Sequence, residues 1–444
     1  MKNLRLFAAA ASLILIAVGT SWGAVWTVGP GGGVDYSKIQ DAIDASTTVA
    51  GDTIEVATGQ YQEQVVVNKA DLTIQAMAGN APQIITTDGN YNTLVSIEAT
   101  GVTLDGLALI SNDGHSRWTG VDVHKQNATI RNCDINSPYN GWPNFGVFAF
   151  NPNDTDKASG LQILDCYFYA GEDAIQLGSG SFHTLEDVVV KGNTIAYWEK
   201  GIYGKNKPLS NLNIEGNTFV GGSFCDYAIG LSQHDSRSGQ IVNNLIYDWT
   251  DKDYTITVGN QDWGDPCDID ILNNTIVNND EAGSGSRGAI YIEGDAGGYV
   301  GKIKNNIIVS NADYGIYSDN PQSGAVIDYN DVWNNGPGGS LNYGPHLSAG
   351  ASDISTDPLF VDLGADDFHL QSTSPCIGAG LTIPRILTDI EENPRKSPPD
   401  MGAFETSSGP PPPVIPEPGA AVVWLLGGVV LLCCAAVRRR RGKV

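Results

Sequence analysis

The chain has 444 residues, enough for a large core or several domains, and it is rich in glycine and poor in methionine. Its formal net charge is −25 at pH 7, from 50 acidic and 25 basic side chains. Binding to nucleic acid needs clustered Lys and Arg opposite the phosphates, so this balance argues against a nucleic-acid partner. It favours a divalent cation such as calcium.

Residues 1–23 are typical of a secretory signal peptide. Lys2 and Arg5 form a charged start, residues 6–18 are apolar, and small residues precede a predicted cleavage site after Gly23. The alternative is a membrane anchor, for which the apolar run is short. We therefore expect an exported protein.

One short helix is expected near the start of the exported part. The stretch YSKIQDAIDA, at 36–45, has apolar residues at helical spacing, and Ser37 is placed to cap its N-terminus. The rest of the chain has the pattern of short strands separated by Gly, Asn and Asp. The helix is therefore expected to cap an all-β structure.

Two columns of residues recur about every 27 positions through the middle of the chain. The first column consists of β-branched residues within a small-Ile-x-apolar pattern, at Val121, Val147, Ile175, Ile202, Ile229, Ile256, Ile290 and Ile316. The second column is polar and consists of Asn193, Asn217, Asn244, Asn274, Asn306 and Asn330, with Cys133 and Cys166 at the same place in earlier repeats.

Each repeat is too short to bury a face alone, so the repeats must stack as a solenoid of parallel strands. The β-branched column is expected to fill the axis, and the asparagines are expected to bond from coil to coil. A resemblance to a known family is supported by four further stretches, WTVGPGGG and GDTIEVATGQY near the start and DPLFVD and PPDMGAFE near the end.

With these stretches, residues 24–406 resemble the right-handed parallel β-helix of the pectate-lyase-like superfamily. The resemblance implies an all-β solenoid with one short N-terminal capping helix. It does not fix the activity, because lyases, hydrolases, adhesins and structural proteins share this fold.

The C-terminal end has three parts: a Pro-rich linker at 407–419, an apolar run at 420–437 and a basic tail at 438–444. The apolar run is just long enough to span a bilayer, and the arginines favour a cytoplasmic tail. With the PEP sequence at 416–418, this order resembles the bacterial PEP-CTERM sorting signal. The resemblance implies export, removal of the tail by a membrane-bound sorting protease, and release or surface attachment. The alternative is a permanent membrane anchor.

Cys133 and Cys166 fall in the same column of neighbouring coils, which lie ~4.8 Å apart in a parallel sheet. That spacing suits a disulfide, and export permits one. The alternative is a pair of buried thiols. No cysteine spacing resembles a zinc site.

A polar and aromatic strip is expected on the outer side of the strands that carry the β-branched column. If Ile175 faces the core, Gln176 faces outward, and so do its equivalents Asp122, Phe148 and Tyr203. In the resembled family the substrate groove runs along this face, walled by loops. The long loops at 111–120 and 136–146 supply further candidates for sugar binding, Trp118, Tyr139 and Trp142. The alternative is that Tyr merely favours exposed strands.

A polysaccharide lyase would need a cation for the uronate carboxylate, a base, and a proton donor. The candidate bases near the strip are His115, Arg117, His124, Lys200 and Lys205. The chain departs from the family here, because no intact catalytic motif of a pectate lyase or of a polygalacturonase-type hydrolase is present.

The sequence GEDAIQLGSG, at 171–180, contains two neighbouring acids that the repeat separates. Glu172 falls in a column with Glu199, Asp226 and Asp253, which is a candidate calcium site, and the alternative is a turn position that favours acids. Asp173 is expected to pair with Lys200 of the next coil and is a further catalytic candidate. Neighbours in a strand point to opposite faces, so Glu172 and Asp173 are not expected to act together.

The sequence therefore predicts an exported or cell-surface β-helix that binds extracellular polysaccharide. The alternative is a polysaccharide lyase or, less favoured, a glycoside hydrolase that acts on acidic polysaccharide in a groove on the strand face.

Overall fold

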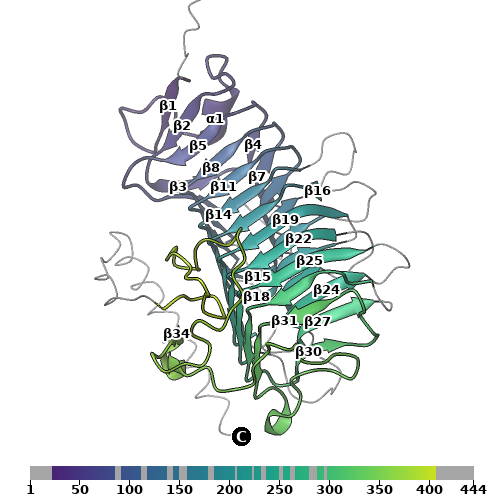
Figure 1. Cartoon of the computed structure of the whole chain (residues 1–444). Helices are drawn as coiled ribbons and strands as arrows, with labels where there is room; N and C mark the ends of the chain where they lie inside the picture. Colours follow the sequence, from purple (N-terminus) through teal and green to yellow (C-terminus); the bar gives the residue numbers. More distant parts are fainter. Residues whose placement is uncertain are drawn as a thin grey trace, which may run out of the picture. The chain divides into compact units, whose positions relative to one another are not determined.

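In the computed structural model, the described residues of the folded part belong to one solenoid and are separated by short gaps (Figure 1). The described residues are 23–85, 92–111, 118–137, 144–149, 158–178, 185–205, 208–222, 225–231, 237–249, 254–260, 266–279, 288–294 and 298–406. The predicted signal peptide up to residue 22, the linker, the apolar run and the basic tail lie outside them. Within these ranges, no helix is both long and apolar enough to cross a lipid bilayer.

The described chain forms a right-handed parallel β-helix, as predicted, in which successive coils add strands to three faces. Every strand pairing between neighbouring coils is parallel. Face 1 is a sheet of its own. Faces 2 and 3 form one sheet, because β15 (Tyr167–Leu177) and β18 (Thr194–Gly204) continue around the corner between them.

The strands of each face follow the order of the coils. Face 1 contains β1 (Val25–Val28), β2 (Thr53–Val56), β5 (Thr73–Ala76), β8 (Thr103–Asp105), β11 (Thr129–Arg131), β14 (Gln162–Leu164), β16 (Leu185–Glu186), β17 (Val189–Lys191), β19 (Leu209–Glu215), β22 (Arg237–Val242), β25 (Cys267–Leu272), β28 (Lys302–Lys304) and β31 (Val326–Asp328). Face 2 contains the first halves of β15 and β18 with β3 (Gly59–Gln62), β6 (Pro82–Ile85), β9 (Ala108–Ile110), β12 (Asp134–Asn136), β20 (Thr218–Val220), β23 (Leu245–Tyr247), β26 (Thr275–Val277), β29 (Ile307–Val309) and β32 (Asp331–Trp333). Face 3 contains the second halves of β15 and β18 with β4 (Val65–Val67), β7 (Asn92–Ile97), β10 (Trp118–Val123), β13 (Asn144–Ala149), β21 (Tyr227–Leu231), β24 (Ile256–Asn260), β27 (Gly288–Gly294) and β30 (Tyr314–Ser318).

The predicted β-branched column fills the axis of the solenoid. Val121 pairs with Val147, Val147 with Ile175, and the pairing continues coil by coil to Ile316. All eight members of the column are fully buried. The repeat period read from the sequence is therefore the register of face 3.

The predicted asparagine ladder is also present, at the corner between faces 1 and 2. From Asn193 to Asn330, each backbone N–H donates to the side-chain oxygen of the next asparagine at 2.9–3.1 Å. The side-chain amides donate back to carbonyls of the preceding coil. A second ladder, at the corner after face 2, links Asn279, Asn311 and Asn335 in the same way. These buried amides tie coils together along the axis.

Cys133 and Cys166 occupy this ladder column in earlier coils, and both are buried free thiols. The backbone N–H of Cys133 lies 3.5 Å from the Cys166 sulfur, and the N–H of Cys166 donates to Asn193 Oδ1 at 2.9 Å. In this structure the pair therefore corresponds to the thiol alternative and forms no disulfide.

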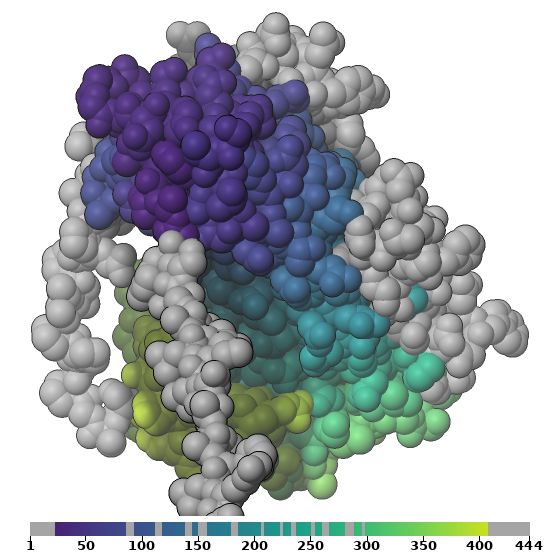
Figure 2. Space-filling view, turned by 90° about the horizontal axis from the view of Figure 1, so that it is seen from above, coloured from purple at the N-terminus to yellow at the C-terminus, as the bar shows by residue number. Residues whose placement is uncertain are grey.

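The two ends of the solenoid are covered by different segments. Helix α1 (Ile39–Asp44) packs against β1, β2 and β4, and the N-terminal residues lie over the near end of the stack in Figure 2. The prediction that Ser37 caps this helix is wrong. The Glu63 carboxylate instead accepts hydrogen bonds from the N–H groups of Ile39 and Gln40, both at 3.0 Å.

The C-terminal segment folds back along face 2 (Figure 1). It contains η1 (Pro337–Gly339), η2 (Leu363–Ala365) and an antiparallel pair, β33 (Phe360–Asp362) and β34 (Asp367–Leu370). Phe368, Leu370, Cys376 and Met401 form a small core with apolar residues of β23, β26 and β29. This part of face 2 is therefore covered by the chain itself.

The asparagine ladder leads to a first testable prediction, for Asn274→Ala. The Asn274 side chain donates to Ile241 O and accepts from the Asn244 N–H, so its loss removes a partner from two buried backbone groups of the preceding coil. Each such group costs about 1–3 kcal/mol. We expect urea unfolding to show a loss of at least about 2 kcal/mol, whereas Asn68→Ala, at an exposed site, should stay within about 0.5 kcal/mol of the wild type. Equal effects of both variants would contradict a stabilising ladder.

Candidate functional site

Face 3 carries most of the outward-facing aromatic residues of the described coils. Two outward positions, three residues apart, occur on the strands of this face, with two buried residues between them. In β13 these are Phe145 and Phe148, whose rings stack at 4.9 Å while Val147 between them is fully buried. The same spacing gives Tyr314 and Tyr317 in β30, with ring centroids 5.1 Å apart.

The rings continue from coil to coil along the axis. Tyr203 stacks on Tyr227 of the next coil with centroids 6.3 Å apart and planes 2° apart. Further along, Tyr254 and Tyr291 stack at 3.9 Å, and Tyr291 approaches Tyr317 at 5.9 Å, but Tyr291 and Tyr317 are only 5% and 8% exposed. Phe148 and Tyr203 are half-buried, as expected for predicted sugar-binding residues. Phe145 and Tyr227 were not predicted as site residues, although FGVF shows the spacing of three between Phe145 and Phe148.

A charged cluster lies between the phenylalanine pair and the tyrosine pair. The Lys200 amine is 3.2 Å from Asp173 Oδ1, 3.2 Å from Glu199 Oε1 and 3.9 Å from Glu172 Oε1. It also lies 5.7 Å from the centre of the Tyr203 ring. Asp173 is 2% exposed and Lys200 is 8% exposed, so these charges meet largely out of water. The predicted pair of Asp173 and Lys200 is present.

The expectation that Glu172 and Asp173 point to opposite faces is wrong. Both carboxylates approach the same amine, because the chain turns at the corner between faces 2 and 3 just before them. Ala170 has φ 54° and Gly171 has φ 152°, which breaks the alternation of a regular strand. A Cβ atom at Gly171 would lie 2.2 Å from the Trp198 ring, so only glycine fits this turn.

Glu172 has a structural role as well as a place in the cluster. Its Oε2 accepts a hydrogen bond from the Asn144 N–H at 3.3 Å, and Asn144 Oδ1 in turn accepts from the Trp118 N–H at 3.0 Å. These side chains bond to the preceding coil as the asparagine ladders do. Glu172 therefore supplies one oxygen to the corner and directs the other toward Lys200.

Burial and charge shift the pKa values of this cluster. Burial raises the pKa of Glu172 to about 7, with a further contribution from Asp173. Burial also raises the pKa of Asp173, although Lys200 acts against this. For Lys200, burial lowers the pKa, but Asp173, Glu199 and Glu172 together outweigh it and raise the value. Lys200 is therefore a charged ammonium at neutral pH, and Glu172 is the group that titrates there.

His124 lies two face-3 strands before β15, in the turn after β10. Its Nδ1 is 3.0 Å from Glu98 Oε1, and its Nε2 is 2.9 Å from Asp122 Oδ1. The hydrogen bond to Asp122 is the largest of several effects that raise the pKa of His124. With both nitrogens facing carboxylates, His124 is suited to join two coils and poorly suited to act as a base.

The remaining candidates have mixed outcomes. Trp118 begins β10 and is buried in the core, so it is not available to a sugar. Gln176 is also buried, and its amide donates to Gly178 O at 2.9 Å, so it does not face solvent as predicted. Lys205 is partly exposed at the end of face 3. The other predicted residues lie outside the described residues: His115, Arg117, Tyr139, Trp142 and Asp253.

The predicted calcium column is only partly described. Glu172 and Glu199 meet at the Lys200 ammonium, which fills the space between them, while Asp226 donates its N–H to Glu199 O. Among the described residues, no three Asp, Glu, His or Cys side chains are grouped to hold a metal ion. Calcium binding by this column stays a prediction.

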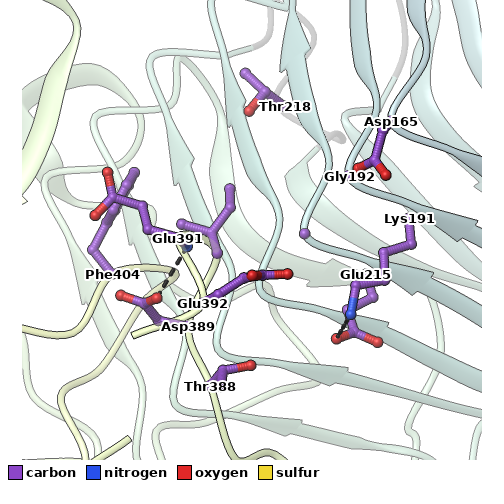
Figure 3. Close-up of a pocket in the computed structure, with 12 residues that line it drawn as sticks. Asp165, Lys191, Gly192, Glu215, Thr218, Thr388, Asp389, Glu391, Glu392 and Phe404 are labelled. Atoms are coloured by element: carbon purple, nitrogen blue, oxygen red, sulfur yellow. Dashed lines mark hydrogen bonds and ion pairs between the residues drawn. The ribbon is translucent and has the colours of Figure 1, made fainter. Parts of the chain in front are cut away.

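A cavity of ~540 Å³ lies on the opposite side of face 2 from this cluster (Figure 3). It separates the C-terminal loop at 388–392 from the corner of the middle coils. Asp165, Lys191 and Glu215 line one wall, and Lys191 pairs with Glu215 at 3.0 Å. The other wall, including Asp389, Glu391 and Phe404, comes from the C-terminal loop. This cavity could not be predicted from the sequence, because its walls are far apart in the chain.

Comparison with known proteins supports the β-helix fold. Residues 83–246 match a family model described as right handed beta helix region, and residues 210–382 match one described as disaggregatase related. A cell surface glycoprotein of Methanothermus fervidus is 31% identical over 114 residues, which are 25% of this chain. The match spans only 18% of that relative's length.

Two solved structures are similar over most of the chain. Pectate lyase Pel9A has a TM-score of 0.45 and 16% identity, covering 88% of this chain and 98% of its own. A PL6 family polysaccharide lyase from Pseudopedobacter saltans has a TM-score of 0.36 and 12% identity, covering 83% and 97%. These similarities assign no activity to this chain, so its function must be argued from its own residues.

The raised pKa of Glu172 leads to a prediction for Glu172→Gln. Between the ordinary value of 4.5 and about 7, the folded protein holds a proton that the unfolded chain releases, so stability falls as pH rises through this window. Gln keeps the acceptor for Asn144 and removes the charge. We expect urea unfolding to show the variant more stable than the wild type at about pH 8, by up to about 3 kcal/mol, and equal to it near pH 4.5.

The matched control for this experiment is Glu392→Gln, which neutralises an exposed carboxylate. It should change stability by less than about 0.5 kcal/mol throughout. If Glu172→Gln destabilised the protein equally at both pH values, Glu172 would instead be stabilised as a carboxylate.

Proposed function

We propose that this protein is an exported or cell-surface β-helix that binds polysaccharide along face 3. The observation that carries the proposal is the succession of outward aromatic rings on both sides of the buried Lys200 cluster. A pyranose ring presents C–H groups on its faces and hydroxyls around its edge. Aromatic rings can pack against these C–H groups, and fixed carboxylates can accept hydrogen bonds from these hydroxyls.

The arrangement of these rings favours a polymer over a single sugar. They project from successive strands of one parallel sheet, ~4.8 Å apart, in a line along the axis. An extended chain lying on this line would contact several rings at once, and linked weak contacts strengthen each other. The strands hold the rings rigidly, so little side-chain freedom is lost on binding.

The location outside the cytoplasm is supported by three observations. The N-terminal sequence is typical of a signal peptide, and the C-terminal end resembles a sorting signal. The matched relative is named a cell surface glycoprotein. In this proposal the C-terminal segment contacts the membrane before a sorting protease removes it.

Alanine substitutions on face 3 test the proposal. In affinity electrophoresis against a panel of neutral and acidic polysaccharides, we expect Phe148→Ala and Tyr203→Ala each to weaken binding at least about tenfold, or about 1.4 kcal/mol. The matched control is Tyr167→Ala, because Tyr167 is a 39% exposed ring on face 2 of the same coil as Asp173. Loss of binding in the control alone would place the binding surface on face 2.

Cleavage of the bound polymer is a second candidate function, favoured by the pKa of Glu172. A carboxyl group with a pKa of about 7 is suited to donate and accept protons at neutral pH. Lys200, held as an ammonium by three carboxylates, is not suited to act as the base. A lyase would release products with an unsaturated sugar, visible by ultraviolet absorbance, and a hydrolase would release reducing ends alone.

A further inference from the structure

We infer that the polysaccharide bound by face 3 is uncharged, with hydroxyl groups but without carboxylate or sulfate groups. This inference rests on the proposed function and names its ligand class. It follows from how the basic groups of the face are already engaged and from which hydrogen-bonding groups remain for a ligand.

Two described cations of face 3, Lys200 and His124, pair with carboxylates of the protein. Lys200 has three of them within 4 Å, at 3.2, 3.2 and 3.9 Å. His124 lies between two, at 2.9 and 3.0 Å. Lys205 lies close enough to Asp173 to lower its pKa. A uronate carboxylate arriving here would have to compete with fixed carboxylates that are already in place.

The local charge adds to this competition. With Lys200 charged and Glu172, Asp173 and Glu199 as its neighbours, the cluster carries more acid than base even when Glu172 is protonated. Toward the C-terminal end of the face, Asp319 adds another carboxylate, which accepts hydrogen bonds from Tyr291 and Tyr317. An anionic polymer would therefore be repelled along the line of the rings, and low dielectric near the buried groups strengthens that repulsion.

The same groups are complementary to an uncharged sugar. An ionised carboxylate only accepts hydrogen bonds, and sugar hydroxyls donate them. Glu199, with a side chain 22% exposed, and Asp122, with one 22% exposed, offer acceptors beside the rings. A uronate carboxylate also only accepts, so it would gain no hydrogen bond from these two carboxylates.

Calcium is the one route by which an acidic face could hold a uronate, since the ion would bridge the two sets of carboxylates. In the described column, however, the Lys200 ammonium already occupies the space between Glu172 and Glu199. Two positive charges in this space would repel each other. The experiment therefore includes calcium as a separate arm.

The test compares two polymers of galactose-type sugars, one uncharged and one with a carboxylate on each residue. The affinities of the full exported chain for a neutral galactan and for polygalacturonate are measured by isothermal titration calorimetry at low ionic strength with EDTA. We expect the neutral polymer to bind at least about tenfold more tightly. We also expect its binding to change little when NaCl is added, because no ion pair with the ligand is involved.

The variant Glu199→Gln makes the test sharper. It frees Lys200 from one carboxylate, so the ratio of polygalacturonate affinity to galactan affinity should rise at least about threefold, whereas Glu392→Gln should leave that ratio unchanged. Polygalacturonate binding as tight as galactan binding, with EDTA or only with calcium, would overturn the inference while supporting polysaccharide binding. Binding of neither these nor any other polymer of the panel would contradict the proposed function itself.

Discussion

The interaction on which this structure depends is the hydrogen bond from the backbone of one coil to a buried side chain of the next. From Asn193 to Asn330 the geometry repeats almost unchanged. The chain must leave regular strand conformation at each corner, which would leave backbone groups without partners in the interior. The ladder satisfies them and fixes the distance and rotation between coils. The in-register columns on all three faces follow from it.

Because the coils stack in register, the position of a residue within its repeat decides what it can do. This is why the β-branched column, the asparagine ladder and the pairing of Asp173 with Lys200 were predictable from spacing alone. Each of these features depends on the period of the repeat, which is visible in the sequence. None of them depends on the path of the chain within one coil.

The features that could not be predicted depend on that path. Glu172 and Asp173 share Lys200 because Ala170 and Gly171 turn the chain, and no alternation rule contains that turn. Trp118 was placed in a loop because the sequence before it is polar, but it begins a strand with its ring inward. For these residues, the spacing predicted the column correctly but not the direction of the side chain.

The charged cluster lies where the regular ladders give way. Asparagines hold the corner after face 1 in the middle coils and the corner after face 2 in the late coils. At the corner after face 2 in the coils of β15 and β18, the strand continues around the bend, and the Glu172 carboxylate accepts from the Asn144 N–H as the Asn144 amide accepts from the Trp118 N–H one coil earlier. A buried amide would satisfy the backbone there at lower cost than a buried carboxylate, whose desolvation disfavours its charged form. The chain keeps charge at this corner at the expense of stability, and the outward rings begin on either side of it, which is the pattern expected where binding, rather than packing, has determined the residues.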